Sequence, residues 1–208
     1  MKAFRLPLKI FLAFSIMTLL SACDTPPPPL RHLSPQDVIV AFGDSLTAGK
    51  GTTKENSYPA KLSKIINIEV INEGISGDES ADGLARISSV LKKHHPRLVI
   101  LALGGNDQLR KRKAAQTKEN LKNIILLIRE SGADIMLIAP PSFTIGLSAP
   151  DFYTELGDKF DIPVDTTTLP SLLKDPDMKS DYIHLNAKGY QALAESIAET
   201  LKKTGARQ

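Results

Sequence analysis

The sequence is poor in residues on which several classes of protein depend. Its 208 residues include a single cysteine, Cys23, so no disulfide can form within the chain. It has no tryptophan and only 5% aromatic residues, which argues against a platform of rings for stacking nucleic-acid bases. We therefore expect neither a disulfide-rich scaffold nor a nucleic-acid partner.

An excess of charge of one sign is also lacking. The whole chain carries a net charge of +3. Lys2, Arg5 and Lys9 lie within the first 22 residues, which hold no acidic residue. If that segment is removed, the net charge of the remaining chain falls to zero. The isoelectric point of about 8.9 therefore gives no reason to expect an acidic partner.

Several catalytic motifs are absent as well. The sequence contains no G-x-S-x-G nucleophile elbow, no H-E-x-x-H zinc motif and no Walker loop. An ordinary α/β-hydrolase, a zinc protease of that type and a P-loop nucleotidase are thus not indicated. We expect no metal and no organic cofactor.

The N-terminus has the pattern of a bacterial lipoprotein signal peptide. Three basic residues precede an apolar stretch over 10–20, which is short for a membrane span. The following Leu20-Ser21-Ala22-Cys23 resembles a lipobox, in which the cysteine is lipidated and becomes the first residue of the mature protein. The alternative is an ordinary signal peptide followed by an incidental cysteine. We predict a signal peptide over 1–22 and lipidation of Cys23.

The residues after Cys23 predict a tethered domain in the bacterial cell envelope, facing the periplasm. Two or more acyl chains anchor a protein stably, and Asp24 resembles the signal by which enteric bacteria retain lipoproteins in the inner membrane. Four prolines over 26–29 form an extended spacer. We expect a linker over 23–36 and one domain over 37–208, present as a monomer.

From residue 37 onward, short apolar runs alternate with longer amphipathic segments. Strands are predicted over 37–42, 68–72, 97–103, 134–139 and 162–165, and helices over 58–66, 81–94, 117–130, 149–160 and 186–203. This alternation is typical of a parallel sheet with helices on both faces. The fold class is therefore α/β: a three-layer α/β/α sandwich around a mostly parallel five-stranded sheet.

Four polar, glycine-rich stretches fall where a predicted strand ends or a helix begins. They cover residues 43–46, 72–78, 104–107 and 181–184. Because the carboxyl ends of parallel strands meet at one edge of a sheet, we expect all four there, where open α/β sheets bind ligands. The serine of the first stretch, Ser45, is either a helix N-cap or a nucleophile.

These four stretches, in this order, resemble the blocks of the GDSL or SGNH hydrolases. The residues that name the family have matches in Ser45 of GDSL, Gly77 of GISGD, Asn106 of GGND and His184 of DYIH. The likeness covers about 38–201 and is closest to the bacterial periplasmic thioesterase, lysophospholipase and arylesterase subgroup. It implies a flavodoxin-like SGNH fold and hydrolysis of carboxylic esters or thioesters through an acyl-serine intermediate.

The chemistry of the matched residues agrees with this resemblance. A serine hydroxyl is a weak nucleophile until a base takes its proton. His184 is the candidate base for Ser45, and Asp181, three residues earlier, is within reach of its ring. Donors for the resulting oxyanion are the backbone N–H groups of Ser45 and Gly77 and the side-chain amide of Asn106.

The walls of the site depart from the pattern of the subgroup, which commonly has G-I-H-P where this chain has Tyr182-Ile183-His184-Leu185. Tyr182 and Leu185 are therefore candidates for substrate binding. Phe143 and Ile145 either line a channel for the acyl group or pack on the domain. The basic run over 110–113 either attracts an anionic ligand or is a solvated surface.

Some polar residues near these blocks are expected to have no chemical role. Asp44 is expected to hydrogen-bond within its turn, and Asp107 to be structural. His94 and His95 precede a proline at a helix end and are expected to be solvated.

Two other functions stay open at this point. One is a carbohydrate or cell-envelope O-acetylesterase that uses the same three residues. The other is a lipoprotein that has kept the fold for ligand binding and lost turnover.

Overall fold

The computed structural model describes residues 26–143 and 146–207. The predictions for residues 1–22, Cys23, Asp24 and Ile145 lie outside the described residues. Within the part described, no helix combines the length and the apolar character needed to cross a membrane.

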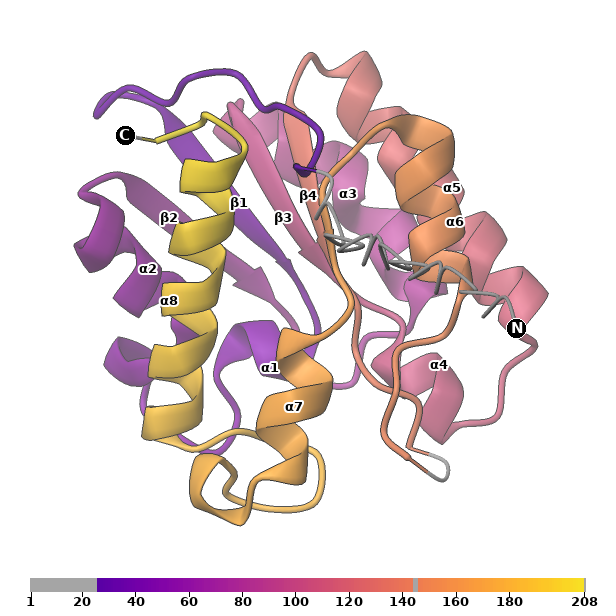
Figure 1. The fold of residues 1–208 in the computed structure, drawn as a ribbon. Helices are drawn as coiled ribbons and strands as arrows, with labels where there is room; N and C mark the ends of the chain where they lie inside the picture. Colours follow the sequence, from indigo (N-terminus) through magenta and orange to yellow (C-terminus); the bar gives the residue numbers. More distant parts are fainter. Residues whose placement is uncertain (1–25, 144–145, 208) are drawn as a thin grey trace, which may run out of the picture.

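A five-stranded sheet forms the middle layer of the fold (Figure 1). Its strands are β1 (Val38–Gly43), β2 (Glu69–Gly74), β3 (Leu98–Ala102), β4 (Asp134–Ile138) and β5 (Val164–Asp165). They lie in the order β2-β1-β3-β4-β5 and every neighbouring pair is parallel. This is the flavodoxin-like order, so the predicted sheet is confirmed.

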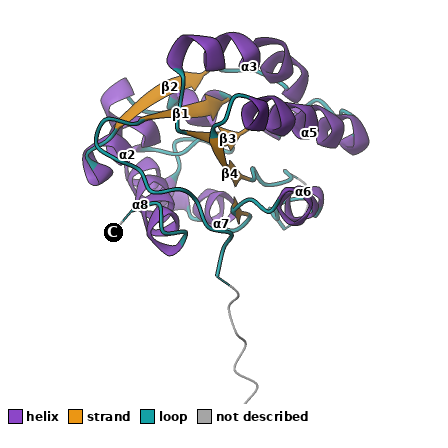
Figure 2. Cartoon of the chain, turned by 90° about the horizontal axis from the view of Figure 1, so that it is seen from above, coloured by secondary structure: helices purple, strands orange, loops and turns teal. Residues whose placement is uncertain are grey.

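The eight α-helices described complete three layers (Figure 2). They are α1 (Ser45–Ala48), α2 (Tyr58–Ile66), α3 (Ser80–His94), α4 (Gly105–Leu109), α5 (Ala114–Glu130), α6 (Phe152–Phe160), α7 (Thr168–Lys174) and α8 (Ala187–Lys203). One buried cluster joins the sheet to α2, α7 and α8, and a second joins it to α3, α5 and α6. The α/β/α sandwich is therefore confirmed.

The long helices form where the sequence places one apolar stripe on a helical period. The stripe of α5 buries Leu121, Ile124, Ile125 and Ile128 completely against the sheet. At the start of α8, the side chain of Asn186 accepts hydrogen bonds from the backbone of the next turn. Pattern and cap together explain why these two helices were predictable.

Short elements and boundaries differ from the prediction. The helices α1, α4 and α7 were not predicted, because four to seven residues are too few to show a period. β5 is shorter than the predicted strand since Pro163 has no N–H to donate to the sheet. α6 begins only at Phe152, just after Pro150, whose carbonyl accepts from Tyr153.

The folded domain begins earlier than predicted. Leu30 and Leu33 donate backbone hydrogen bonds of 3.0 and 2.9 Å to the carbonyls of Thr204 and Ala206. The side chain of Leu33 is 1% exposed and belongs to the core. The prediction of a linker as far as residue 36 is therefore wrong, because two leucines within a polar run are enough to bind that run to the domain.

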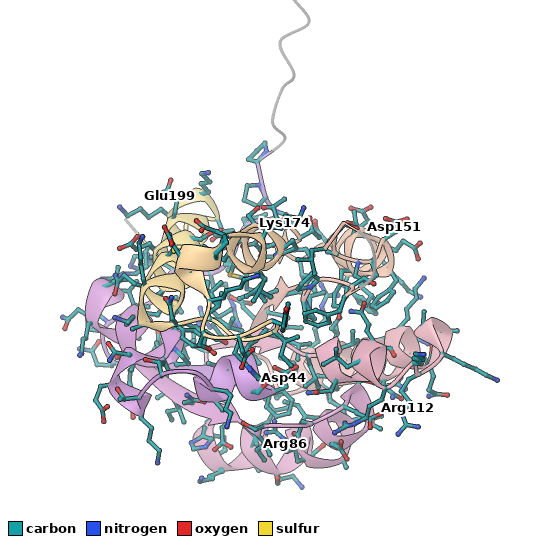
Figure 3. All side chains as sticks on the ribbon, turned by 90° about the horizontal axis from the view of Figure 1, so that it is seen from below. Asp44, Arg86, Arg112, Asp151, Lys174 and Glu199 are labelled. Carbon is teal, nitrogen blue, oxygen red and sulfur yellow. The ribbon has the colours of Figure 1, made fainter. Side chains whose placement is uncertain are left out.

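All four polar stretches meet at the carboxyl edge of the sheet, which is the lower end in Figure 1. The last residue of β1, Gly43, pairs with Gly74 of β2 and Ala102 of β3. The three chain segments that follow these residues therefore leave the sheet side by side. Figure 3 views this edge directly, with Asp44 near its centre.

Candidate active site

Three of the predicted residues form one chain of hydrogen bonds. The Nε2 atom of His184 lies 3.1 Å from the hydroxyl oxygen of Ser45. Its Nδ1 atom lies 2.8 and 3.0 Å from the two carboxylate oxygens of Asp181. The carboxylate contact requires a proton on Nδ1, which leaves Nε2 as an acceptor for the Ser45 hydroxyl. This is the arrangement that a nucleophile, its base and the partner of that base require.

Ser45 is the first residue of α1, and its neighbour Asp44 is the N-cap. The carboxylate of Asp44 accepts a 3.0 Å hydrogen bond from the backbone of Leu46. The predicted turn role of Asp44 is thus confirmed, and Ser45 is not the cap. Its hydroxyl remains available to His184.

Close approach between α1 and β2 fixes where Ser45 stands. A Cβ atom at Gly74 would lie 2.2 Å from the backbone nitrogen of Ala48, inside any contact distance. A Cβ atom at Gly43 would lie equally close to the carbonyl oxygen of Ala102. Glycine at both positions lets the nucleophile-bearing turn rest directly on the sheet.

His184 is held by a tight turn. The backbone of Ser180 donates to the carbonyl of His184 over 2.9 Å. One carboxylate oxygen of Asp181 also accepts from the backbone N–H groups of Ile183 and His184, both at 2.9 Å. Burial raises the pKa of Asp181, but the hydrogen bonds from His184 and Ile183 outweigh it and leave the pKa below its usual value. The carboxylate therefore stays ionised beside the imidazole.

Of the predicted oxyanion donors, Ser45 and Asn106 lie at the same hollow, and Gly77 belongs to the turn that Asn106 contacts. Asn106, in the first turn of α4, donates from Nδ2 to the carbonyl of Asp78 over 2.9 Å, and its second N–H remains for a substrate. Gly77 directly precedes Asp78 and has φ +93°, a conformation that favours glycine. Ser45 and Asn106 line one common hollow.

The hollow beside Ser45 has a volume of about 20 Å³. Its apolar lining comes from Leu46, Leu109, Pro140, Phe143 and Ile183. Of the predicted wall residues, Phe143 lies here. Sequence reasoning missed Leu109, although it stands one helical turn after Asn106, where the two side chains share a face.

The two predicted wall residues next to His184 lie in opposite surroundings. Tyr182 is 88% exposed. Leu185 is fully buried in the core, against the start of α8. The expectation that Leu185 faces a substrate is therefore wrong: the chain has turned inward by this residue to begin the helix.

Asp107 has the structural role expected of it. Its buried carboxylate accepts from the backbone and hydroxyl of Ser80, at 2.8 and 2.5 Å, and from the hydroxyl of Thr117 at 3.1 Å. The start of α3 is thereby tied to α4 and α5. The stretches that carry Gly77 and Asn106 are held in one relative position.

The basic run over 110–113 is partly engaged by the protein itself. Arg110 and Arg112 both contact the carboxylate of Glu79, at 2.9 and 2.6 Å. Arg110 also donates to the carbonyl of Gly77 over 2.8 Å. The hydrogen bond from Arg112 lowers the pKa of Glu79. These two arginines therefore brace the loop of Gly77, a role that neither sequence interpretation anticipated.

His94 is not solvated, contrary to the prediction. Its Nε2 atom lies 2.6 Å from the carboxylate of Glu73, and its side chain is 11% exposed. The last residue of α3 is turned toward β2, a tertiary contact that the helical period of α3 does not reveal. His95 is exposed as predicted.

Burial makes Asp44 a pH-sensitive group. Burial raises the pKa of Asp44 to about 7 against the opposing hydrogen bond from Leu46, and Asp78 and Asp107 add to the rise. In the unfolded chain the carboxyl of Asp44 ionises near pH 3.8. The stability gained from protonation of Asp44 in the fold is therefore fully present below that pH. This stability is lost as the pH rises toward 7.

The Asp44→Asn variant is expected to gain stability over the wild type as the pH rises. The variant keeps the cap but does not titrate. Its advantage should grow between pH 4 and pH 7 to on the order of 4 kcal/mol, measured by urea unfolding. Asp37→Asn is the control of opposite sign, because the backbone hydrogen bond from Ser34 lowers the pKa of Asp37. If the stability advantage of Asp44→Asn were equal at pH 4 and pH 7, the raised pKa of Asp44 would be contradicted.

Comparison with known proteins identifies the family of this chain. Residues 41–192 match the family described as GDSL-like Lipase/Acylhydrolase. The chain belongs to this family. The match spans all three polar stretches after β1, β2 and β3 and the turn of His184.

Named relatives of this GDSL-like acylhydrolase are enzymes. It is 33% identical over 176 residues to "Thioesterase 1/protease 1/lysophospholipase L1" of Escherichia coli, covering 80% of this chain and 84% of the relative. It is 32% identical to the "Arylesterase" of Vibrio mimicus, with coverage of 79% and 88%. Among solved structures it resembles AlinE4, titled an SGNH-hydrolase family esterase, at 34% identity and a TM-score of 0.63, with coverage of 82% and 97%. The protein is an ester-hydrolysing enzyme.

Proposed function

We propose that this GDSL-like acylhydrolase cleaves carboxylic esters or thioesters through an acyl intermediate on Ser45. The observation that carries the proposal is the hydrogen-bonded chain from Asp181 through His184 to Ser45, which ends in the hollow shared with Asn106. A structural serine would need neither a base nor an amide donor beside it.

The residues divide the reaction between them. Ser45 Oγ attacks the acyl carbon while His184 Nε2 takes its proton, and Asp181 stabilises the imidazolium. The carbonyl oxygen becomes an oxyanion that accepts from the backbone N–H groups of Ser45 and Gly77 and from Asn106 Nδ2. Collapse expels the alcohol or thiol, which takes the proton from His184. Water then attacks the acyl-serine with His184 as base, releasing the acid and restoring Ser45.

The hollow favours a short acyl group. Its apolar lining suits a hydrocarbon chain, while its volume of about 20 Å³ lies far below the range of about 300–1,000 Å³ common for small-molecule sites. The relatives named thioesterase, lysophospholipase and arylesterase support esters and thioesters as the substrate class. The small hollow also favours a second candidate function, an O-acetylesterase acting on carbohydrate or the cell envelope.

The cellular setting is part of the proposal. Removal of residues 1–22, lipidation of Cys23 and anchoring in the cell envelope facing the periplasm are supported by the sequence pattern alone. Asp24 favours the inner membrane. Mass spectrometry of the protein purified from a bacterial host tests this, since the N-terminal peptide should begin at a cysteine that carries acyl chains.

Hydrolysis of p-nitrophenyl esters from acetate to palmitate tests the function. We expect kcat/KM to be highest for acetate to butyrate, and a fluorophosphonate reagent to stop turnover by adding one group to Ser45. Release of acetate from acetylated polysaccharide, measured beside the ester series, separates the two candidate substrates. Folded protein that hydrolyses no ester and takes no phosphonate would refute the proposal and favour a ligand-binding lipoprotein.

Tyr182 is expected to affect long substrates only. Its ring is 88% exposed and stands two residues before His184, so it can cover the part of an acyl chain that the hollow does not hold. Tyr182→Ala should raise KM for p-nitrophenyl palmitate by about tenfold, the equivalent of about 1.4 kcal/mol of lost apolar burial. KM for the acetate should change little. An equal change for both esters would show that Tyr182 acts on the site itself.

A further inference from the structure

Arg86 connects the turns before Ser45 and around Gly77, and through them Asn106, without lining the hollow itself. It lies in the middle of α3 and is labelled in Figure 3, which views the carboxyl edge of the sheet. Its Nε atom donates to the carboxylate of Asp78 over 2.7 Å, and its Nη2 atom donates to the carbonyl of Gly43 over 3.0 Å. Its guanidinium carbon lies 3.9 Å from the centre of the Phe42 ring.

Each group that Arg86 holds leads directly to a predicted oxyanion donor. Gly43 stands two residues before Ser45, and its carbonyl also accepts from the backbone of Ile75 over 3.0 Å. Ile75 and Asp78 are the ends of the turn that contains Gly77, closed by a 3.2 Å hydrogen bond from the Asp78 backbone.

The third donor is attached to the same turn. The carbonyl of Asp78 accepts from Asn106 Nδ2, so a displacement of Asp78 also displaces the amide of Asn106. The three donors come from three chain segments that leave three different strands. The side chain of Arg86 hydrogen-bonds both Gly43, from which the first segment leaves β1, and Asp78, in the turn of the second segment.

Resting on the proposed function, we propose that Arg86 is a positioning residue for the reaction. It sets the distance between the Ser45 turn and the Gly77 turn, and through Asp78 the direction of the Asn106 amide. Oxyanion donors stabilise the transition state only when they are already aimed at the position of the developing charge. Loss of Arg86 should therefore lower kcat and leave substrate binding nearly unchanged.

Stability alone gives a weaker reason for an arginine here. The Nη1 atom of Arg86 is buried and has no hydrogen-bond partner among the described residues. A buried donor without a partner opposes folding, and buried ion pairs are often replaceable by apolar residues without loss of stability. What only arginine supplies is a planar group with two N–H directions, one to a carboxylate and one to a carbonyl.

The chain contains a matched control. Arg31 donates from Nε to the carboxylate of Asp134 over 2.9 Å and from Nη2 to the carbonyl of Gly132 over 2.6 Å. This is the same pair of contacts, but Asp134 begins β4, at the opposite edge of the sheet. Arg31→Gln therefore removes the same kinds of bond far from Ser45, from a side chain that is 45% exposed against 17% for Arg86.

The experiment compares Arg86→Gln, Arg86→Lys and Arg31→Gln in the full-length protein. Active sites are counted by fluorophosphonate titration, so that unfolded molecules do not enter kcat. With p-nitrophenyl butyrate, Arg86→Gln should lower kcat on the order of 10²-fold, as expected for donors misplaced by about 1 Å. KM should stay within about threefold. Arg86→Lys, which keeps the charge but not both directions, should fall between, and Arg31→Gln should match the wild type.

Two readouts, kcat per titrated site and NMR spectra, separate positioning from simple destabilisation. In NMR spectra, the side-chain amide resonances of Asn106 should shift in Arg86→Gln and not in Arg31→Gln. Equal kcat per titrated site in the two glutamine variants, or unshifted Asn106 resonances, would overturn the inference. If the wild type hydrolyses no ester, the proposed function fails and the NMR comparison still decides the role of Arg86.

Discussion

Replacement of Ser45 by alanine is expected to lower kcat for ester hydrolysis by about 10⁶-fold, the size of effect seen when a serine hydrolase loses its nucleophile. The hydroxyl is the atom that must attack the acyl carbon, and the base 3.1 Å away has nothing else to deprotonate at that point. Measurement requires a sensitive assay, such as prolonged incubation with p-nitrophenyl acetate, because the residual rate approaches spontaneous hydrolysis.

The fold of this variant should be unchanged. Asp44 supplies the N-cap of α1, so the loss of the Ser45 hydroxyl removes no capping bond. A suitable control is Ser63→Ala, because the Ser63 hydroxyl donates to the carbonyl of Ile68, just after the end of α2. Both variants should unfold within about 2 °C of each other, since each loses one partly exposed hydrogen bond. A Ser45→Ala protein that keeps more than a hundredth of the activity would assign the nucleophile to another group.

The layers of the fold could be predicted because they depend on repetition. β1 and β3 are continuous apolar runs, as strands buried on both faces must be. The stripes of α3, α5 and α8 extend over four turns or more. A period repeated that often is visible without knowledge of the neighbours, and an alternation of strands and helices leaves few topologies.

Elements that depend on a single tertiary contact could not be predicted. Nothing in the sequence near Leu33 indicates that this residue packs beside the C-terminal end of α8. His94 is bound by Glu73, 21 residues earlier. α4 starts with glycine, a weak helix former, and exists because its residues are fixed from other segments, as Asp107 is by hydrogen bonds from Ser80. Local propensity does not contain that information.

The site shows the same division. Ser45, His184 and Asn106 stand at strand ends or helix starts, where type and position together indicate chemistry. The structure places Ser45 and Asn106 at one hollow and His184 within hydrogen-bond distance of Ser45. Leu185 shows the limit of sequence neighbourhood: one residue after His184, it already belongs to the core. The bracing roles of Arg110 and Arg112 could not be predicted for another reason, since a charged surface residue usually faces water and only its partners show otherwise.

The Asp181→Asn variant is expected to lower kcat by about 10⁴-fold, because it inverts the tautomer of His184. The asparagine oxygen can still accept from the backbone of Ile183 and His184, which directs its NH₂ group toward Nδ1. Nδ1 must then accept and Nε2 must carry the proton. A protonated Nε2 facing Ser45 cannot take the proton of the hydroxyl.

The predicted signature is specific to the base. KM should change little. The rate at which fluorophosphonate labels Ser45 should fall by about the same factor as kcat, since both reactions need the same proton transfer. Asp175→Asn is the matched control. The carboxylate of Asp175 accepts the same kind of local hydrogen bond, from the backbone of Asp177, but has no histidine partner. If Asp181→Asn and Asp175→Asn retained equal activity, the carboxylate 2.8 Å from Nδ1 would be a turn residue. The alignment of His184 would then rest on the backbone of its turn alone.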